Sequence, residues 1–153
     1  MTKPEITIRL FTPDDLPYLT ALERNVYGSG AYSEYFFRQL YDLFPQLIWV
    51  AERDGALAGH ICGAVAADCA SGWVLNFAVQ AHSRRMGVGR ALMQHCMDQL
   101  LKHGVRTIKT TVLHDNDAGI ALCEKLGYKS TGVQEDYYRD GVDRLIMVYE
   151  ARA

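Results

Sequence analysis

Two glycines and three arginines lie together at residues 84–90, whose sequence is Arg-Arg-Met-Gly-Val-Gly-Arg. This segment follows an apolar run that ends at Val79 and precedes a long amphipathic run. Glycines at the start of a helix let backbone N–H groups approach a ligand, because no Cβ stands in the way. Those N–H groups, the positive end of the helix dipole and the arginine side chains together suit a phosphate group. The sequence therefore indicates an anion-binding loop at residues 84–90.

Other interpretations of this loop remain open at this point. Glycine spacing alone favours a loop whose glycines only turn the chain and whose arginines are solvated. The segment is not a Walker loop, because no Gly-Lys-Ser/Thr sequence follows it. It is not a clean dinucleotide fingerprint either, because the third glycine is missing. The loop by itself thus predicts an anion without saying which one.

The cysteines and histidines form no pattern that would hold a metal. Four cysteines are scattered without a CxxC pair, at Cys62, Cys69, Cys96 and Cys123. His60 lies in an alternating, strand-like run, where a packed or hydrogen-bonded core histidine is the favoured interpretation. The other histidines suggest no ligand set. We therefore expect no metal site and no disulfide framework.

The elements that must position the loop follow from hydrophobic periodicity. Alternating or continuous apolar runs predict strands over residues 6–10, 47–52, 57–66, 73–79, 106–112, 128–136 and 145–149. Apolar stripes bounded by caps, glycines or prolines predict helices that begin near residues 12–15 and over residues 33–44, 87–103 and 116–126. The order β-α-α-β-β-β-α-β-α-β-β predicts an α/β or α+β sheet with helices on both faces.

Composition narrows the classes of partner. The chain has 153 residues, close to the usual size of one domain. Sixteen Lys and Arg against eighteen Asp and Glu give a net charge of −2, which argues against a nucleic-acid or membrane-surface binder. No apolar stretch approaches the roughly 18 residues that a membrane span needs, and the first residues lead into no secretory run. We expect a cytoplasmic protein.

A second segment places the loop in a family context. Residues 116–128 read Asn-Asp-Ala-Gly-Ile-Ala-Leu-Cys-Glu-Lys-Leu-Gly-Tyr. They resemble the asparagine-containing helix and Leu-Gly-aromatic turn of the GNAT superfamily of N-acetyltransferases, and the loop at residues 84–90 resembles its acyl-CoA pyrophosphate loop. The resemblance covers nearly the whole chain and implies a single N-acetyltransferase domain over residues 1–153. It implies a mixed central sheet of about seven strands, flanked by about four helices and splayed between strands 4 and 5.

Three segments resemble one subgroup more closely, the protein N-terminal acetyltransferases, which include enzymes acting on ribosomal proteins. They are residues 44–59, residues 82–87 and the Tyr-Tyr-Arg-Asp-Gly-Val-Asp sequence of residues 137–143. The resemblance implies that acetyl-CoA is the co-substrate and that a primary amine attacks it directly, without a covalent enzyme intermediate. A peptide or protein N-terminus is the leading acceptor.

The resemblance also implies residues for each substrate. Those implied for acetyl-CoA lie at a strand end, in the loop and at two helix starts: Phe77, Ala78, Val79, Arg84, Arg85, Met86, Gly87, Val88, Gly89, Arg90 and Asn116. Those implied for the acceptor amine are aromatic or acidic: Tyr32, Glu34, Tyr137 and Tyr138.

The acid–base positions depart from the family pattern. Trp73 and Thr111 occupy positions where relatives often carry a residue that ionises, and Cys123 replaces a tyrosine that protonates the leaving thiolate. A thiol has an ordinary pKa of about 8.5, close to that of the departing thiol, so Cys123 is one catalytic candidate. A small buried packing residue is the alternative for Cys123. Tyr138 is the second candidate, because its hydroxyl could hold the amine or a relay water.

Two other functions stay open. One is acetylation of a small amine such as a polyamine, an amino acid or an aminoglycoside. The other is a regulatory module that binds CoA without turnover, which the departures at Trp73 and Cys123 motivate. Dimers are common in the superfamily, so a homodimer is a further expectation.

Overall fold

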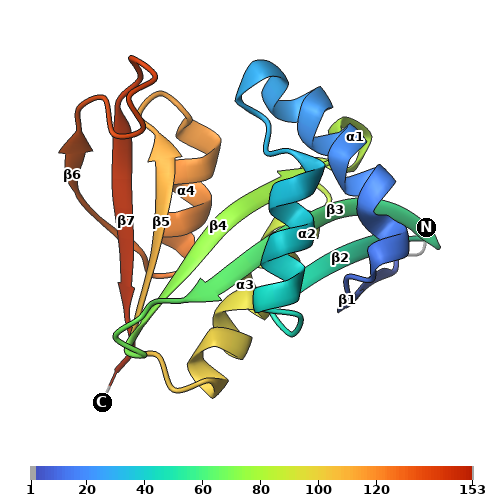
Figure 1. Cartoon of the computed structure of the whole chain (residues 1–153), viewed down its shortest axis with the longest axis horizontal. Helices are drawn as coiled ribbons and strands as arrows, with labels where there is room; N and C mark the ends of the chain where they lie inside the picture. Colours follow the sequence, from blue (N-terminus) through green and yellow to red (C-terminus); the bar gives the residue numbers. More distant parts are fainter. Residues whose placement is uncertain (1–2, 153) are drawn as a thin grey trace.

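The computed structural model describes residues 3–152, and a seven-stranded sheet runs through its centre (Figure 1). The strands are β1 (Ile6–Leu10), β2 (Ile48–Arg53), β3 (Ala56–Val65), β4 (Ser71–Val79), β5 (Thr107–Leu113), β6 (Lys129–Gln134) and β7 (Arg144–Glu150). Their order in the sheet is β1-β2-β3-β4-β5-β7-β6. All neighbours are antiparallel except β4 and β5, which run parallel because α3 crosses between them.

Four α-helices cover the two faces of the sheet. They are α1 (Leu16–Tyr27), α2 (Glu34–Leu43), α3 (Val88–Lys102) and α4 (Asp117–Lys125), with short 3-10 turns at Pro13–Asp15, Gly28–Gly30 and Ala81–Ser83. Strand β2 shows how the faces divide, because side chains alternate along a strand. Ile48 and Val50 pack in the cluster that contains α1 and α2, whereas Trp49 and Ala51 pack in the cluster that contains α3 and α4.

Local signals account for the helix boundaries. The Ser33 hydroxyl accepts a hydrogen bond from the Phe36 N–H (3.3 Å), which caps the start of α2. The Asp15 carboxylate accepts from the Thr12 N–H (2.9 Å) and pairs with Arg9 (2.8 Å), which ties the start of α1 to β1. The predicted fold class, with its seven strands, four helices and both sheet faces covered, is confirmed.

Two irregularities in β4 prepare the functional site. The strand pairs with β5 at only three positions, from Ser71–Thr107 to Trp73–Lys109, and the two strands then separate. On its other side β4 carries a bulge, since Cys62 pairs with Asn76 and Gly63 pairs with Val74, which leaves Leu75 as an extra residue. The splay predicted between strands 4 and 5 is therefore confirmed.

None of the helices described in residues 3–152 is long and apolar enough to cross a membrane.

Candidate active site

The separation of β4 and β5 opens a cavity of about 430 Å³. Just beyond the last backbone pair, the Thr110 hydroxyl donates to the Val74 carbonyl (3.1 Å), and past that point the strands no longer contact each other through the backbone. The cavity is lined by β4 and β5, by the ends of α1 and α4, and by residues of the β6–β7 connection. A carbonyl or N–H on the free edge of β4 can therefore bond to a ligand instead of a neighbouring strand.

The predicted anion-binding loop lies between the carboxyl end of β4 and the start of α3. Arg85 and Gly87 both have left-handed backbone conformations, with φ of 63° and 87°. The first N–H groups of α3 have no acceptor within the helix, and Gly87, which precedes α3, has no side chain that could cap them. Gly89 allows α3 to lie close to β4, since a Cβ there would stand 3.0 Å from the Phe77 ring. The exposed Arg84 and Arg90 flank these groups with positive charge.

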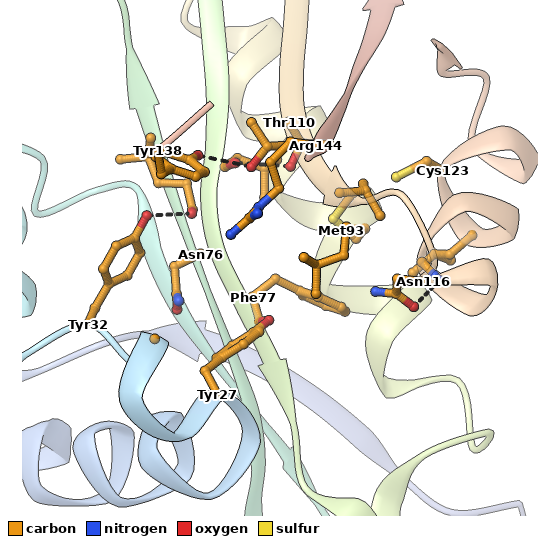
Figure 2. A pocket seen from close by; sticks show the side chains of 18 of the residues that line it. Tyr27, Tyr32, Asn76, Phe77, Met93, Thr110, Asn116, Cys123, Tyr138 and Arg144 are labelled. Carbon is orange, nitrogen blue, oxygen red and sulfur yellow. Dashed lines mark hydrogen bonds between the residues drawn. The ribbon is translucent and has the colours of Figure 1, made fainter. Parts of the chain in front are cut away.

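Asn116 closes the opposite side of the cavity. Its Oδ1 accepts from the Gly119 N–H (3.0 Å) and so caps α4. Its amide nitrogen points toward the cavity (Figure 2). Phe77 also lines the cavity, while Ala78 and Val79 continue β4 as buried residues. Of the residues predicted for acetyl-CoA, Phe77 and Asn116 thus line the cavity, whereas residues 84–90 lie in the loop beyond the end of β4.

Tyrosines occupy the side of the cavity away from Asn116 and Cys123 (Figure 2). The Tyr32 hydroxyl donates to the Leu75 carbonyl (3.4 Å), and the Tyr138 hydroxyl bonds to the Thr111 hydroxyl (3.0 Å). Burial is the main cause that raises the pKa of Tyr32 to about 12, so its hydroxyl remains a donor at neutral pH. Two predicted acceptor residues, Tyr32 and Tyr138, therefore line the same cavity.

The other two predicted acceptor residues lie elsewhere. Tyr137 packs its ring edge against Tyr138, with centroids 4.8 Å apart, but does not line the cavity. The Glu34 carboxylate pairs with Arg24 (3.3 Å), and Glu34 does not line the cavity either. Instead Arg144, held by Asp140 at 2.8 Å and packed against the Tyr138 ring, points into the cavity (Figure 2). The sequence pattern did not single out Arg144, because it lies at the first residue of a strand.

The three altered acid–base positions have separate environments. Trp73 lies under the Lys109 ammonium (5.8 Å) at the closed end of the splay, and Thr111 bonds to Tyr138. Cys123 lines the cavity but is only 4% exposed. Burial, with a smaller contribution from Glu124, raises the pKa of the Cys123 thiol to about 11. The expected match between this thiol and the departing thiol took the pKa of a solvated cysteine, and burial moves the Cys123 pKa away from that value; its role as the acid stays a prediction.

Sequence analysis also missed a buried polar cluster of Glu23, His60 and Asn76. Glu23 is 1% exposed and lines the cavity, and Asn76 on β4 donates to it. The available signal was spacing: Glu23 follows Leu19 by one helical turn and lies on the apolar face of α1, where a carboxylate is unusual. The prediction that His60 is a packed or hydrogen-bonded core histidine is confirmed, because it is fully buried and bonds to Asn76 (2.8 Å).

Comparison with known families agrees with this geometry. The model of the acetyltransferase (GNAT) family matches residues 16–128, which include the splayed strands, the anion-binding loop and α4. The chain belongs to the GNAT family. Within the residues described, no cluster of histidine, cysteine or acidic side chains could hold a metal ion in this GNAT chain.

Three relatives show how far the similarity extends. The GNAT chain is 37% identical over 86 residues to the [ribosomal protein bS18]-alanine N-acetyltransferase of Escherichia coli, a match that covers 56% of this chain and 57% of that enzyme. The enzyme of the same name from Salmonella typhimurium is 30% identical over 132 residues, 86% of each chain. The solved structure of Ard1 from Thermoplasma volcanium has a TM-score of 0.88 and 26% identity, and covers 97% of this chain and 99% of that one.

Proposed function

We propose that this GNAT chain transfers the acetyl group of acetyl-CoA to the primary amine at a peptide or protein N-terminus. One observation carries the proposal: the cavity between β4 and β5 is lined by tyrosines, and two residues of its wall, Phe77 and Leu122, lie next to Gly89 at the start of α3. A thioester donor and an amine acceptor must meet from two directions, and this arrangement provides both.

The donor side suits a molecule with a charged end and a linear, hydrogen-bonding arm. The N–H groups at the start of α3 and the arginines at 84, 85 and 90 suit a pyrophosphate. The free edge of β4 suits an arm that contains amides, and the Asn116 amide nitrogen can contact it from across the cavity. The Phe77 carbonyl on this edge accepts from the Tyr27 hydroxyl and not from β5, since the pairing of β4 with β5 ends at Trp73.

The acceptor side favours an N-terminal α-amine. Tyr32 and Tyr138 come from the α1–α2 and β6–β7 connections, and a peptide can extend away between these connections once its amine is in the cavity. The names of the relatives support this choice, because those from Escherichia coli and Salmonella typhimurium are alanine N-acetyltransferases of a ribosomal protein. The amine attacks the thioester carbonyl directly; Cys123 is the candidate proton donor to the thiolate, and Tyr138 is the candidate that holds the amine or a relay water.

An acceptor panel tests the proposal. Acetyl-CoA is supplied with peptides that carry different free N-termini, with the same peptides blocked at the N-terminus, and with spermidine, free alanine and an aminoglycoside. We expect steady release of the CoA thiol with at least one free peptide, none with its blocked counterpart, and a mass increase at the N-terminus. Turnover only with a small amine would favour the small-amine alternative. Tight binding of acetyl-CoA with no turnover on any amine would favour the regulatory alternative.

The cytoplasmic location and the homodimer remain predictions. Fractionation of cells and the mass of the purified chain in solution test them.

A further inference from the structure

A buried carboxylate forms part of the cavity wall on the acceptor side. Glu23 on α1 is 1% exposed and lines the cavity. Burial of a carboxylate is costly unless hydrogen bonds stabilise its charge. Here Oε1 accepts from the Asn76 Nδ2 (2.6 Å) and Oε2 accepts from the Tyr32 backbone N–H (2.9 Å). Each oxygen still has a second lone pair, so the carboxylate can accept a further proton or hydrogen bond.

His60 orients this carboxylate through Asn76. The His60 Nε2 lies 2.8 Å from the Asn76 Oδ1 and 3.5 Å from the Glu23 Oε1. Because the Asn76 amide nitrogen donates to Glu23, its oxygen must accept, so His60 carries a proton on Nε2. The His60 Nδ1 is buried and has no hydrogen-bond partner within residues 3–152. Side chains of α1, β3 and β4 thus hold one carboxylate in a fixed orientation.

The cluster adjoins the strand edge where the two substrates would meet. Asn76 directly follows Leu75, the extra residue of the β4 bulge. Tyr32 connects the two sites, since its N–H donates to Glu23 and its hydroxyl donates to the Leu75 carbonyl. The only other carboxylate among the described cavity residues is Asp140, which is paired with Arg144 at 2.8 Å.

We propose that Glu23 is the proton acceptor for the acceptor amine, an inference that rests on the proposed function. The ammonium group gives one proton to the Glu23 carboxylate, and the freed lone pair forms the C–N bond at the thioester carbonyl. The tetrahedral intermediate then collapses: the C–S bond breaks, its electron pair leaves on sulfur, and the second amine proton moves to the thiolate. Glu23 then returns its proton to solvent. The products are the amide, the CoA thiol and one released proton.

Other ionisable groups face Glu23, and their effects on the pH profile of kcat must be distinguished from the effect of Glu23. They are Tyr27 on the same helix, Tyr32 in the next connection, His60 and Cys62 on β3, and Tyr138, Asp140 and Arg144 across the cavity. Burial raises the pKa of Tyr27 and of Tyr32 to about 12 and raises that of Cys62, so these three stay protonated below pH 9.5. Arg144 is always charged. His60→Gln removes the imidazole but keeps a donor at the Nε2 position.

The test is the pH dependence of kcat with a free peptide at saturating acetyl-CoA. At pH 6.5 we expect Glu23→Gln to lower kcat by about 10²-fold while acetyl-CoA affinity changes by less than about twofold. The loss should shrink to less than about threefold above pH 9, because an α-amine with a pKa of about 7.7–8.0 is then already neutral. Glu23→Asp keeps the negative charge but holds it one methylene farther from the cavity. Its loss of kcat should lie between that of Glu23→Gln and that of the wild type. Asp98→Asn, the same type of change on the exposed face of α3, is the matched control.

Several outcomes would overturn this role. If Glu23→Gln lowers kcat by the same factor at every pH, or leaves it unchanged, Glu23 only holds Tyr32 and Asn76 in place. If Glu23→Gln does not fold, Glu23→Asp and His60→Gln decide: loss of the acidic limb of the profile in His60→Gln assigns the proton acceptor to His60. A wild-type chain that acetylates no peptide overturns the proposed function as well, whereas normal turnover with an unaltered Glu23→Gln profile overturns the Glu23 role alone.

Discussion

The two sides of the cavity are built in different ways. The side that we propose for the donor uses mainly backbone groups, at the free edge of β4 and, beyond the cavity, at the start of α3. The side that we propose for the acceptor uses side chains from separate elements, with Glu23 from α1, Asn76 from β4 and Tyr138 from the β6–β7 connection. A site made of backbone depends on local conformation, whereas a site made of side chains depends on which distant segments meet. Binding of the donor and choice of the acceptor should therefore respond to different mutations.

The two sides also differ in charge. Arginines at positions 84, 85 and 90 are exposed around the loop and suit a phosphate-bearing donor. The acceptor side holds a buried carboxylate among tyrosines, which suits a group that arrives as an ammonium ion. Arg144, the positively charged residue that lines the cavity in the part of the chain described, is paired with Asp140 (2.8 Å), which leaves Glu23 as the carboxylate without a cationic partner at that distance.

The largest effect should come from the donor loop. Gly87→Val places a branched side chain at φ 87° in the anion-binding loop, and we expect acetyl-CoA affinity to fall at least about 100-fold, or about 2.7 kcal/mol. Calorimetric titration with CoA measures this loss. Gly104→Val is the matched control, because it imposes a similar strain (φ 90°) after the far end of α3, where a Cβ meets open space. A folded Gly87→Val variant with normal affinity would show that the loop does not bind the donor.

The next effect should be confined to the acceptor side. Tyr138→Phe removes the hydroxyl that bonds to Thr111, a bond worth about 0.5–1.5 kcal/mol. We expect the KM for a peptide acceptor to rise roughly 3- to 10-fold with unchanged acetyl-CoA affinity. Thr111→Val and the double variant complete a mutant cycle, in which the second change should add little to the first. A fall in donor affinity would show that the two sides are not separable.

A smaller effect tests the contact that we propose between the Asn116 side chain and the donor. Asn116→Ala removes both the cap of α4 and the amide nitrogen at the cavity, and should cost about 1 kcal/mol of unfolding free energy together with a several-fold loss of CoA affinity. Asn116→Asp keeps the capping oxygen and should lose only affinity. Ser33→Ala, which removes the cap of α2, should lose only stability, as thermal unfolding and titration can show together.

The smallest effect is expected at Cys123. Because burial raises the pKa of its thiol to about 11, the thiol is a poor proton donor to a thiolate of ordinary pKa. Cys123→Ala should therefore leave kcat within about twofold of the wild type. A loss in the general-acid range of roughly 10²–10⁴-fold would instead restore Cys123 as the acid. Tyr138→Phe, measured for kcat in the same assay, tests the second candidate.

The sequence by itself determined the elements and the donor loop. Helix and strand periods, the Ser33 and Asn116 caps, and the positive φ at Gly87 each depend on residues that are neighbours in the chain. Predicted boundaries therefore agree with the observed ones to within a few residues: for example, residues 128–136 were expected for the strand observed at Lys129–Gln134. The resemblance to the GNAT superfamily added the splay, which no local period encodes.

Only the tertiary structure decided the acceptor side. Glu23 and Asn76 are 53 residues apart, and His60 and Asn76 are 16 apart, yet they form one buried cluster. The pattern of α1 indicates which face is buried, but it does not say which strand residue that face meets. The bulge at Leu75 and the pairing of Glu34 with Arg24 likewise depend on register and on packing between distant segments. Local residues fix local geometry, whereas the position of a side chain relative to a distant partner is fixed only when the sheet and helices pack together.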